Sequence, residues 1–128
     1  MTDTRGSKVA NVYLALAILG YLLPGVPMLM ESVQTGNVLF WLDPARTNAQ
    51  LFANRTSTAF ALDLLAVVAT ALLWMTREAA RVGIRAVWRF WVLTLLFGLG
   101  GTLPLFLWFR ERRLGVASAR GAAGSVAA

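Results

Sequence analysis

The stretch LFANRTSTAFALDLLAVV, residues 51–68, decides how this chain is built, because it passes from polar to apolar within a few residues. The apolar run that it opens, residues 58–75, has Asp63 as its only charged residue. A helix of that length rises about 27 Å, close to the roughly 30 Å of hydrocarbon in a bilayer. The pattern therefore predicts a transmembrane helix that carries one carboxylate.

Two further apolar runs, residues 9–30 and 90–109, contain no charge, and Pro24 and Pro27 are expected to kink or end the first. The chain of 128 residues is 58% hydrophobic and 14% charged, whereas soluble domains carry about 25% charged residues. We therefore expect an all-α integral membrane protein with three transmembrane helices. Its membrane domain would cover residues 9–114, after a polar head at 1–8 and before a disordered tail, rich in small residues, at 115–128.

One long polar connection, residues 31–57, separates the first two runs. Within it, residues 37–53 combine an apolar patch around Trp41 with a short helical pattern after Pro44. Aromatic side chains beside charged ones are typical of the membrane–water interface. The sequence thus predicts one interfacial segment at residues 37–53.

The net charge is +6, with eleven Arg and one Lys against six acidic residues. Three spans would divide the twelve basic residues six against six, so only Arg5 and Lys8, before the first span, favour a cytoplasmic N-terminus. We expect a multi-pass protein of the inner (cytoplasmic) membrane whose arginines contact membrane lipids, including anionic lipids. No nucleic-acid-binding motif is present, so no nucleic-acid partner is expected.

The chain has no Cys and no His, which removes the usual ligands of zinc and haem and the commonest general base. No metal or cofactor is predicted, while a bound lipid, isoprenoid or pigment remains open. Only Asp63 and Glu31 are candidate catalytic acids. Catalysis by them would require the two carboxylates to converge on one cavity.

Asp63 belongs to a stripe of positions seven apart, Thr56, Asp63, Thr70 and Arg77, which share nearly one face of a helix. Such a polar and small-residue stripe should face other helices, because a carboxylate facing lipid costs about 2.5–3.5 kcal/mol on insertion scales. Asp63 either pairs with Arg55 or a helix N-terminus and fixes the loop to the bundle, or it binds a cation, a proton or a substrate. Nearby, Asn54 is suited to cap the helix.

The third run carries Gly98, Gly101 and Thr102, whose spacing is typical of close helix packing, although Gly-Gly-Thr-Leu-Pro would also suit a loosened helix. The tryptophans lie at the ends of the predicted spans or in the interfacial segment and indicate an aromatic belt: Trp41, Trp74, Trp88, Trp91 and Trp108. The arginines expected at the lipid interface are Arg77, Arg81, Arg85, Arg110, Arg112 and Arg113.

Three blocks, LFANRTSTAFALDLL, REAARVGIRAVW and LPLFLWFRERRL, resemble an uncharacterised family of small bacterial membrane proteins, a domain of unknown function. The resemblance covers roughly residues 50–114, and the loop reads Glu-Ala-Ala-Arg where the family pattern has Glu-Gly-Arg-Arg. It implies a protein with three membrane spans and polar family positions at Asn54, Ser57, Asp63, Glu78, Arg110 and Glu111.

Three functions are compatible with these features. The first is a small non-enzymatic accessory or structural subunit that packs against a larger membrane complex or against itself, so a membrane-protein partner or a homo-oligomer is expected. The second is a membrane enzyme or binding protein for an isoprenoid-like lipid that uses Asp63. The third is a small carrier or a channel-forming oligomer, in which the broken first span and the Gly-rich third span line a path.

Overall fold

The computed structural model describes the backbone of residues 3–127 and the side chains of residues 6–127, and it is helical in almost all of them. This confirms the all-α prediction. The elements are α1 (Asp3–Thr35), the 3-10 helix η1 (Val38–Phe40), α2 (Pro44–Leu51), α3 (Arg55–Val82), α4 (Val87–Phe97) and α5 (Leu99–Ala127).

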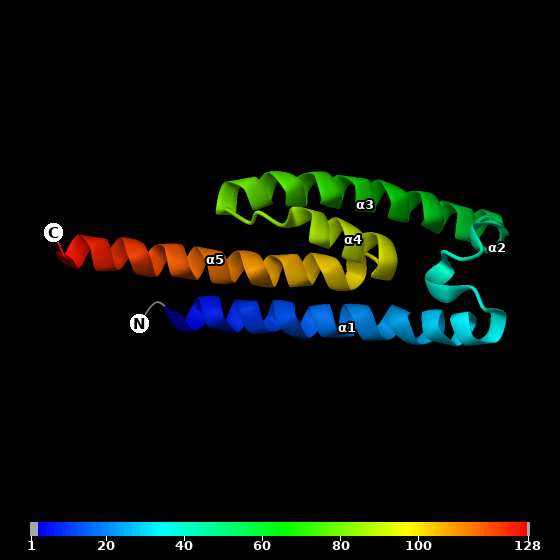
Figure 1. Cartoon of the computed structure of the whole chain (residues 1–128), viewed down its shortest axis with the longest axis horizontal. Helices are drawn as coiled ribbons and strands as arrows, with labels where there is room; N and C mark the ends of the chain where they lie inside the picture. The colour runs from blue at the N-terminus through cyan, green and yellow to red at the C-terminus, as the bar shows by residue number, and fades with distance from the viewer. Residues whose placement is uncertain (1–2, 128) are drawn as a thin grey trace.

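Two helices are long and apolar enough to cross a membrane: α1 over Gly6–Thr35 and α3 over Arg55–Val82. They run in opposite directions on the two sides of α5, and η1 and α2 connect them at one end (Figure 1). The helix of α1 continues through Pro24 and Pro27, so the prolines do not end it. α3 contains the whole of the predicted run 58–75.

The apolar run 90–109 does not form the one helix that its composition predicts. α4 ends at Phe97, α5 begins at Leu99, and Gly98 between them has φ 88° and ψ 167°. This backbone conformation is essentially restricted to glycine, because a Cβ atom would clash with the chain. The chain turns back on itself at Gly98 and forms a helical hairpin of α4 and α5 (Figure 1).

The contacts between helices fix the directions of this hairpin. Trp74 of α3 stacks edge-on against Phe106 of α5, with ring centroids 5.7 Å apart, and Glu78 pairs with Arg110. In each pair the two residues are 32 positions apart in sequence. Because this separation stays constant along the contact, α3 and α5 run parallel. The start of α1, the end of α3 and the outer part of α5 therefore lie at the same end of the molecule, which we call the basic end (Figure 1).

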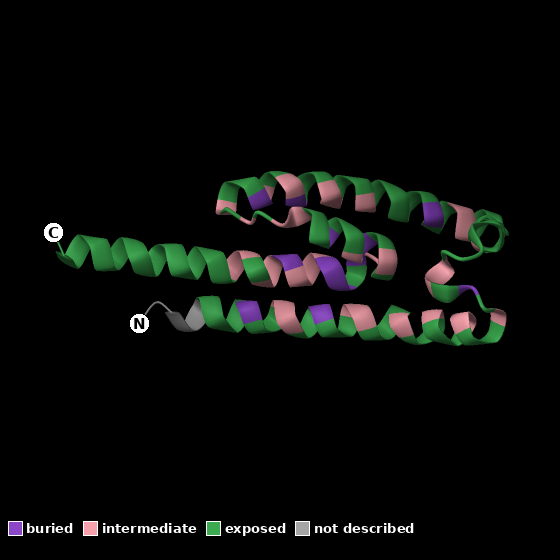
Figure 2. Ribbon diagram, viewed as in Figure 1, coloured by how far each residue is buried: buried purple, intermediate pink, exposed green. Residues whose placement is uncertain are grey.

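A small apolar core forms where α3, α4 and α5 meet. Phe106 and Met75 are fully buried, and the ring of Phe90 stands perpendicular to that of Phe106 at 5.2 Å. Elsewhere α1 and α3 expose most of their apolar side chains (Figure 2). Burying a large apolar side chain stabilises a fold by about 1.5–3 kcal/mol in water, so this core fixes the hairpin and leaves the outer faces uncovered.

α1 meets α5 through glycine. A Cβ atom added at Gly20 would overlap the backbone of Gly100 and would lie 2.7 Å from the nitrogen of Gly101. The same addition at Gly101 would overlap the ring of Tyr21. These two positions let the backbones of α1 and α5 approach closely, which is the role that small residues play between membrane helices.

Both chain ends continue the neighbouring helices. The polar head is helical from Asp3, and the tail, which was expected to be disordered, is helical up to Ala127; residues 1, 2 and 128 lie outside that description. α5 runs exposed beyond the bundle from Leu114 onward (Figure 2). Its many alanines explain the difference, because alanine has the highest intrinsic helix propensity.

Candidate functional site

Asp63 lies on the exposed side of α3, beside an open hollow of about 510 Å³. The hollow is lined by Arg55, Thr56, Ala59, Phe60 and Asp63. Among the side chains of residues 6–127, Asp63 has neither an ion pair nor a hydrogen bond, so the pair with Arg55, one of the alternatives considered for this carboxylate, is not formed. Thr70 is also exposed, and its hydroxyl donates to the carbonyl oxygen of Ala66 at 2.9 Å. Within this chain Asp63 thus lies beside residues of α3 alone, whereas Thr70 lies at an open groove between α3 and α5.

The N-terminus of α3 is capped as predicted. The Asn54 side chain accepts a hydrogen bond from the backbone nitrogen of Ser57 at 2.9 Å, and the Ser57 hydroxyl oxygen accepts one from the backbone nitrogen of Asn54 at 3.2 Å. This reciprocal capping box satisfies two backbone donors that have no partner inside the helix. Asn54 and Ser57 therefore set where α3 begins, and with it the position of Asp63.

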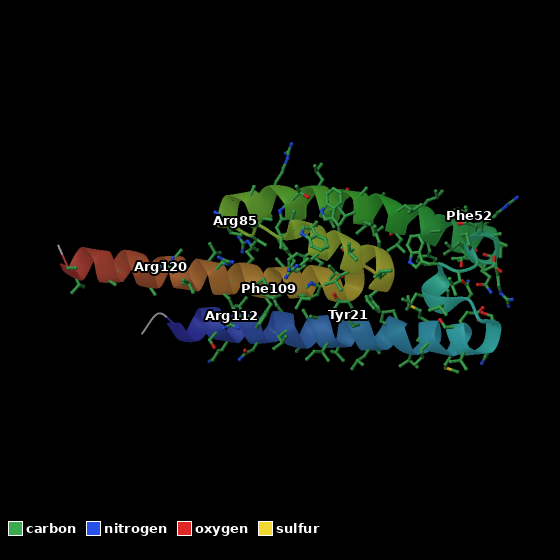
Figure 3. The ribbon with its side chains drawn as sticks, in the orientation of Figure 1. Tyr21, Phe52, Arg85, Phe109, Arg112 and Arg120 are labelled. Atoms are coloured by element: carbon green, nitrogen blue, oxygen red, sulfur yellow. The ribbon has the colours of Figure 1, made fainter. Side chains whose placement is uncertain are left out.

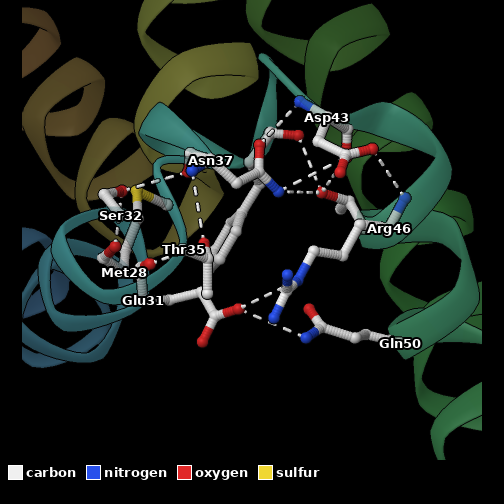
Figure 4. A network of polar contacts seen from close by, with 10 residues as sticks. Met28, Glu31, Ser32, Thr35, Asn37, Asp43, Arg46 and Gln50 are labelled. Atoms are coloured by element: carbon white, nitrogen blue, oxygen red, sulfur yellow. Dashed lines mark hydrogen bonds and ion pairs between the residues drawn. The ribbon is translucent and has the colours of Figure 1, made fainter.

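Glu31, the second candidate acid, lies in a different network. Its carboxylate is 3.7 Å from Arg46 Nε and accepts a hydrogen bond from Gln50 Nε2 at 3.2 Å (Figure 4). Glu31 is not among the residues that line the hollow at Asp63. The two carboxylates do not converge on one cavity, which is the arrangement that general acid–base catalysis by this pair would require.

Asn37 organises the loop between α1 and α2, although the sequence analysis did not single it out. Its side chain is 1% exposed, donates through Nδ2 to Thr47 Oγ1 at 2.9 Å, and accepts at Oδ1 from the backbone nitrogen of Asp43 at 2.8 Å (Figure 4). Asp43 in turn caps α2 by accepting from the backbone nitrogen of Arg46 at 3.0 Å. The position of Asn37, a side-chain amide in a turn between two apolar segments, was the feature of the sequence that could have indicated this role.

Replacing Asn37 with alanine is expected to loosen this loop and cost about 1–3 kcal/mol, because it leaves buried hydrogen-bonding groups without a partner. Limited proteolysis of the purified protein between α1 and α3 measures the effect. Asn48→Ala is the matched control, since Asn48 is exposed on α2. Equal protease resistance of both variants would contradict the role of Asn37.

Three side chains bind the hairpin turn around Gly98. Trp41 donates from Nε1 to the carbonyl oxygen of Leu95 at 3.1 Å, and Thr102 donates from Oγ1 to that of Gly98 at 3.0 Å. The hydroxyls of Tyr21 and Thr102 are 2.9 Å apart, and Tyr21 lies on the side of α1 that faces α5 (Figure 3). Leu95 lies in the last turn of α4, where carbonyls lack helical partners, so the bond from Trp41 satisfies one of them; the bond from Thr102 is made within the first turn of α5.

The role of Gly98 therefore differs from the expected one. A Cβ atom at Gly98 would meet nothing within 4 Å, so the position is not a close helix contact. Its positive φ makes it a turn residue. Gly101 and Thr102 are buried against α1, and Trp41, expected only at a lipid interface, also reaches the end of α4.

Trp41→Phe is expected to lower the free energy of local opening at the turn by about 1 kcal/mol, because phenylalanine keeps an aromatic ring but has no N–H to donate to the Leu95 carbonyl. Faster hydrogen exchange of the backbone amides around residues 95–99 would report the opening. Trp88→Phe is the control, as Trp88 is 61% exposed at the start of α4. Unchanged exchange in Trp41→Phe would show that the bond is dispensable.

At the basic end, Glu78 joins α3 to α5. Arg81 donates to Glu78 from Nε and Nη2 at 2.9 and 2.6 Å, and Arg110 bonds both Glu78 and, at 2.7 Å, Glu111. The bond to Arg81 joins residues three positions apart in one helix, whereas the bond to Arg110 joins residues 32 positions apart and could not be expected from the sequence. Glu78, Arg110 and Glu111, polar positions of the resembled family, thus form one network.

The remaining tryptophans and arginines lie mostly around this end. Trp91 donates from Nε1 to Thr76 Oγ1 at 3.1 Å, and Trp74 packs on Phe106. Arg89 lies over the Trp88 ring at 5.7 Å and Arg112 over the Trp108 ring at 4.9 Å. Of the arginines predicted at the lipid interface, three are exposed and have neither such a contact nor an ion pair in the described part of the chain: Arg77, Arg85 and Arg113.

The other prediction on ligands concerns metals. Among the side chains of residues 6–127, no group of three acidic residues is placed so that it could hold a metal ion.

These features define a small all-helical protein with two long apolar helices, a short apolar hairpin and a one-sided basic end. Residues 12–112 match the family described as "Protein of unknown function DUF2834". The chain belongs to this family, and the match includes α1 from Val12, which the resemblance covered only as apolar sequence. No curated protein and no solved structure matches the chain.

Proposed function

We propose that this chain is a small non-enzymatic protein of the inner membrane, an accessory or structural subunit that packs against a larger membrane complex or against a second copy. One observation carries the proposal. Asp63 and Thr70 are exposed on α3, and contact of Asp63 with lipid would cost about 2.5–3.5 kcal/mol for an ionised carboxylate. A protein partner that covers the stripe removes this cost and supplies a polar group for Asp63.

The exposed apolar faces of α1 and α3 support a membrane location, because such surfaces would be unstable in water. In that membrane, α1 and α3 cross fully, while α4 and α5 form a hairpin that enters and leaves on the same side. The proposed topology has two spans and one re-entrant hairpin in place of the three spans expected from the sequence. Irregular backbone at that depth is tolerated where protein surrounds it, as Tyr21, Trp41 and Thr102 surround the turn at Gly98.

This topology also supports an orientation. Ten of the twelve basic residues belong to the basic end: Arg5, Lys8, Arg77, Arg81, Arg85, Arg89, Arg110, Arg112, Arg113 and Arg120. Only Arg46 and Arg55 belong to the opposite end. Because basic residues are retained in the cytoplasm, both termini are proposed to be cytoplasmic.

The absence of Cys makes the topology directly testable by single-cysteine labelling in intact cells. With a membrane-impermeant maleimide, Asn48→Cys on α2 should be labelled from outside, while Ser7→Cys and Ser125→Cys should react only after permeabilisation. Labelling of Ser125→Cys but not of Ser7→Cys from outside would instead establish three full spans. Labelling of Ser7→Cys from outside would reverse the orientation.

Photo-crosslinking from the stripe tests the subunit proposal. A benzophenone maleimide on Thr70→Cys, in native membranes, should give a discrete protein adduct that mass spectrometry identifies as a partner or a second copy. Leu65→Cys is the matched control: Leu65 is 60% exposed and lies on nearly the opposite side of α3 from Asp63. Adducts to lipid alone from both sites would overturn the proposal.

A second function, binding of an isoprenoid-like lipid, is favoured by one observation. An open apolar groove of about 500 Å³ runs between α3 and α5, lined by Ala66, Val67, Thr70, Ala71, Trp74, Leu103 and Leu107. Its lining would accept an isoprenoid chain. Gentle purification followed by lipid extraction distinguishes the two functions, because a stoichiometric isoprenoid without a protein partner would support the second.

A further inference from the structure

The basic end presents more positive charge than its own acidic residues neutralise. Arg81 and Arg110 are held by Glu78 and Glu111. Six other arginines of this end are exposed, and among the side chains of residues 6–127 they have no carboxylate partner: Arg77, Arg85, Arg89, Arg112, Arg113 and Arg120. Three of these arginines, Arg85, Arg112 and Arg120, are labelled at this end of the molecule in Figure 3.

Two of these arginines make cation–π contacts with tryptophan rings, and the two contacts lie at a similar level of the helix bundle. Arg89 lies over Trp88 at the start of α4, and Arg112 lies over Trp108 on α5. The rings of Phe90 and Phe109, next to these pairs, are 5.8 Å apart, so the two pairs belong to adjoining segments. Tryptophan rings settle at the level of lipid headgroups, where a neighbouring guanidinium meets phosphate.

We infer that the arginines Arg77, Arg85, Arg89, Arg112 and Arg113 form a docking surface for the phosphate groups of anionic phospholipids in the cytoplasmic leaflet. We choose anionic phospholipid as the ligand because the charges are complementary: the surface is basic, and the negatively charged cytoplasmic leaflet lies next to it in the proposed topology. A guanidinium binds phosphate with two parallel hydrogen bonds and, unlike an ammonium group, also stacks on an aromatic face. The inference rests on the proposed membrane location.

Native mass spectrometry of the full chain, purified with added phosphatidylglycerol or phosphatidylcholine, tests the surface. The wild-type protein should retain phosphatidylglycerol in preference. Arg89→Gln with Arg112→Gln should weaken that retention about fivefold for each arginine removed. Arg46→Gln with Arg55→Gln removes the same charge from the opposite end and should leave retention unchanged.

Each outcome bears on one claim. Equal loss in both double variants would show that net charge alone attracts the lipid and would overturn the surface. Equal retention of the two lipids by the wild-type protein would overturn it as well. Arg89→Lys with Arg112→Lys keeps the charge and reports folding; it should recover only part of the retention. Membrane extraction with alkaline carbonate is measured beforehand, because release of the protein there would refute the membrane location itself.

Discussion

Replacing Gly20 with alanine should separate α1 from α5 and destabilise the protein. The added Cβ would overlap the backbone of Gly100, and backbone cannot rotate away as a side chain can. Relief would require the helices to move apart, which would also stretch the bond between Tyr21 and Thr102. We expect a cost of at least about 1–3 kcal/mol, the range for overpacked sites.

Gly25→Ala is the matched control for this prediction, because Gly25 lies in the same helix and a Cβ there would meet nothing within 4 Å. Alanine should be neutral or stabilise the helix by about 0.5–1 kcal/mol. Unfolding in mixed micelles with increasing denaturing detergent measures both variants against the wild-type protein. Indistinguishable midpoints for Gly20→Ala and Gly25→Ala would show that α1 does not pack on α5 at this glycine.

Gly98→Leu should change the direction of the chain's last segment. Leucine at φ 88° and ψ 167° costs about 1–3 kcal/mol or more, whereas a straight helix through position 98 restores the interrupted hydrogen bonds. Residues 90–109 are long and apolar enough to cross the bilayer once straightened. We therefore expect part of the population to expose the C-terminus on the outer side, where Ser125→Cys would react with an impermeant maleimide.

Gly115→Leu controls for the size of the new side chain, because a Cβ at Gly115 meets nothing within 4 Å and its φ is not positive. It should leave Ser125→Cys protected in intact cells. A Gly98→Leu protein with a fully protected C-terminus and wild-type stability would contradict the glycine requirement at the turn.

The long helices were predictable from the sequence, because length and hydropathy decide them. The run 58–75 needs a helix to satisfy its backbone in hydrocarbon, and Asn54 marks where that helix starts. The hairpin was not predictable in the same way. Gly98 has the spacing of a packing glycine, and composition records neither its φ nor the direction in which the chain continues.

The polar contacts likewise fall into local ones, which the sequence predicted, and long-range ones, which it did not. Capping by Asn54 is local, so its spacing to Ser57 predicted it. The bonds from Trp41 to Leu95 and from Glu78 to Arg110 join residues 54 and 32 positions apart, and only the folded chain brings them together. One reversed helix also turns an even division of basic residues into ten against two.

The half-length hairpin gives the protein an uneven cross-section. Four helices, α1, α3, α4 and α5, lie side by side toward the basic end, whereas beyond the turn at Gly98 only α1 and α3 continue, joined by η1 and α2 (Figure 1). In a bilayer such a wedge would displace more lipid from one leaflet than from the other. The protein should therefore favour membranes whose cytoplasmic face is convex. Many copies close together would increase this curvature.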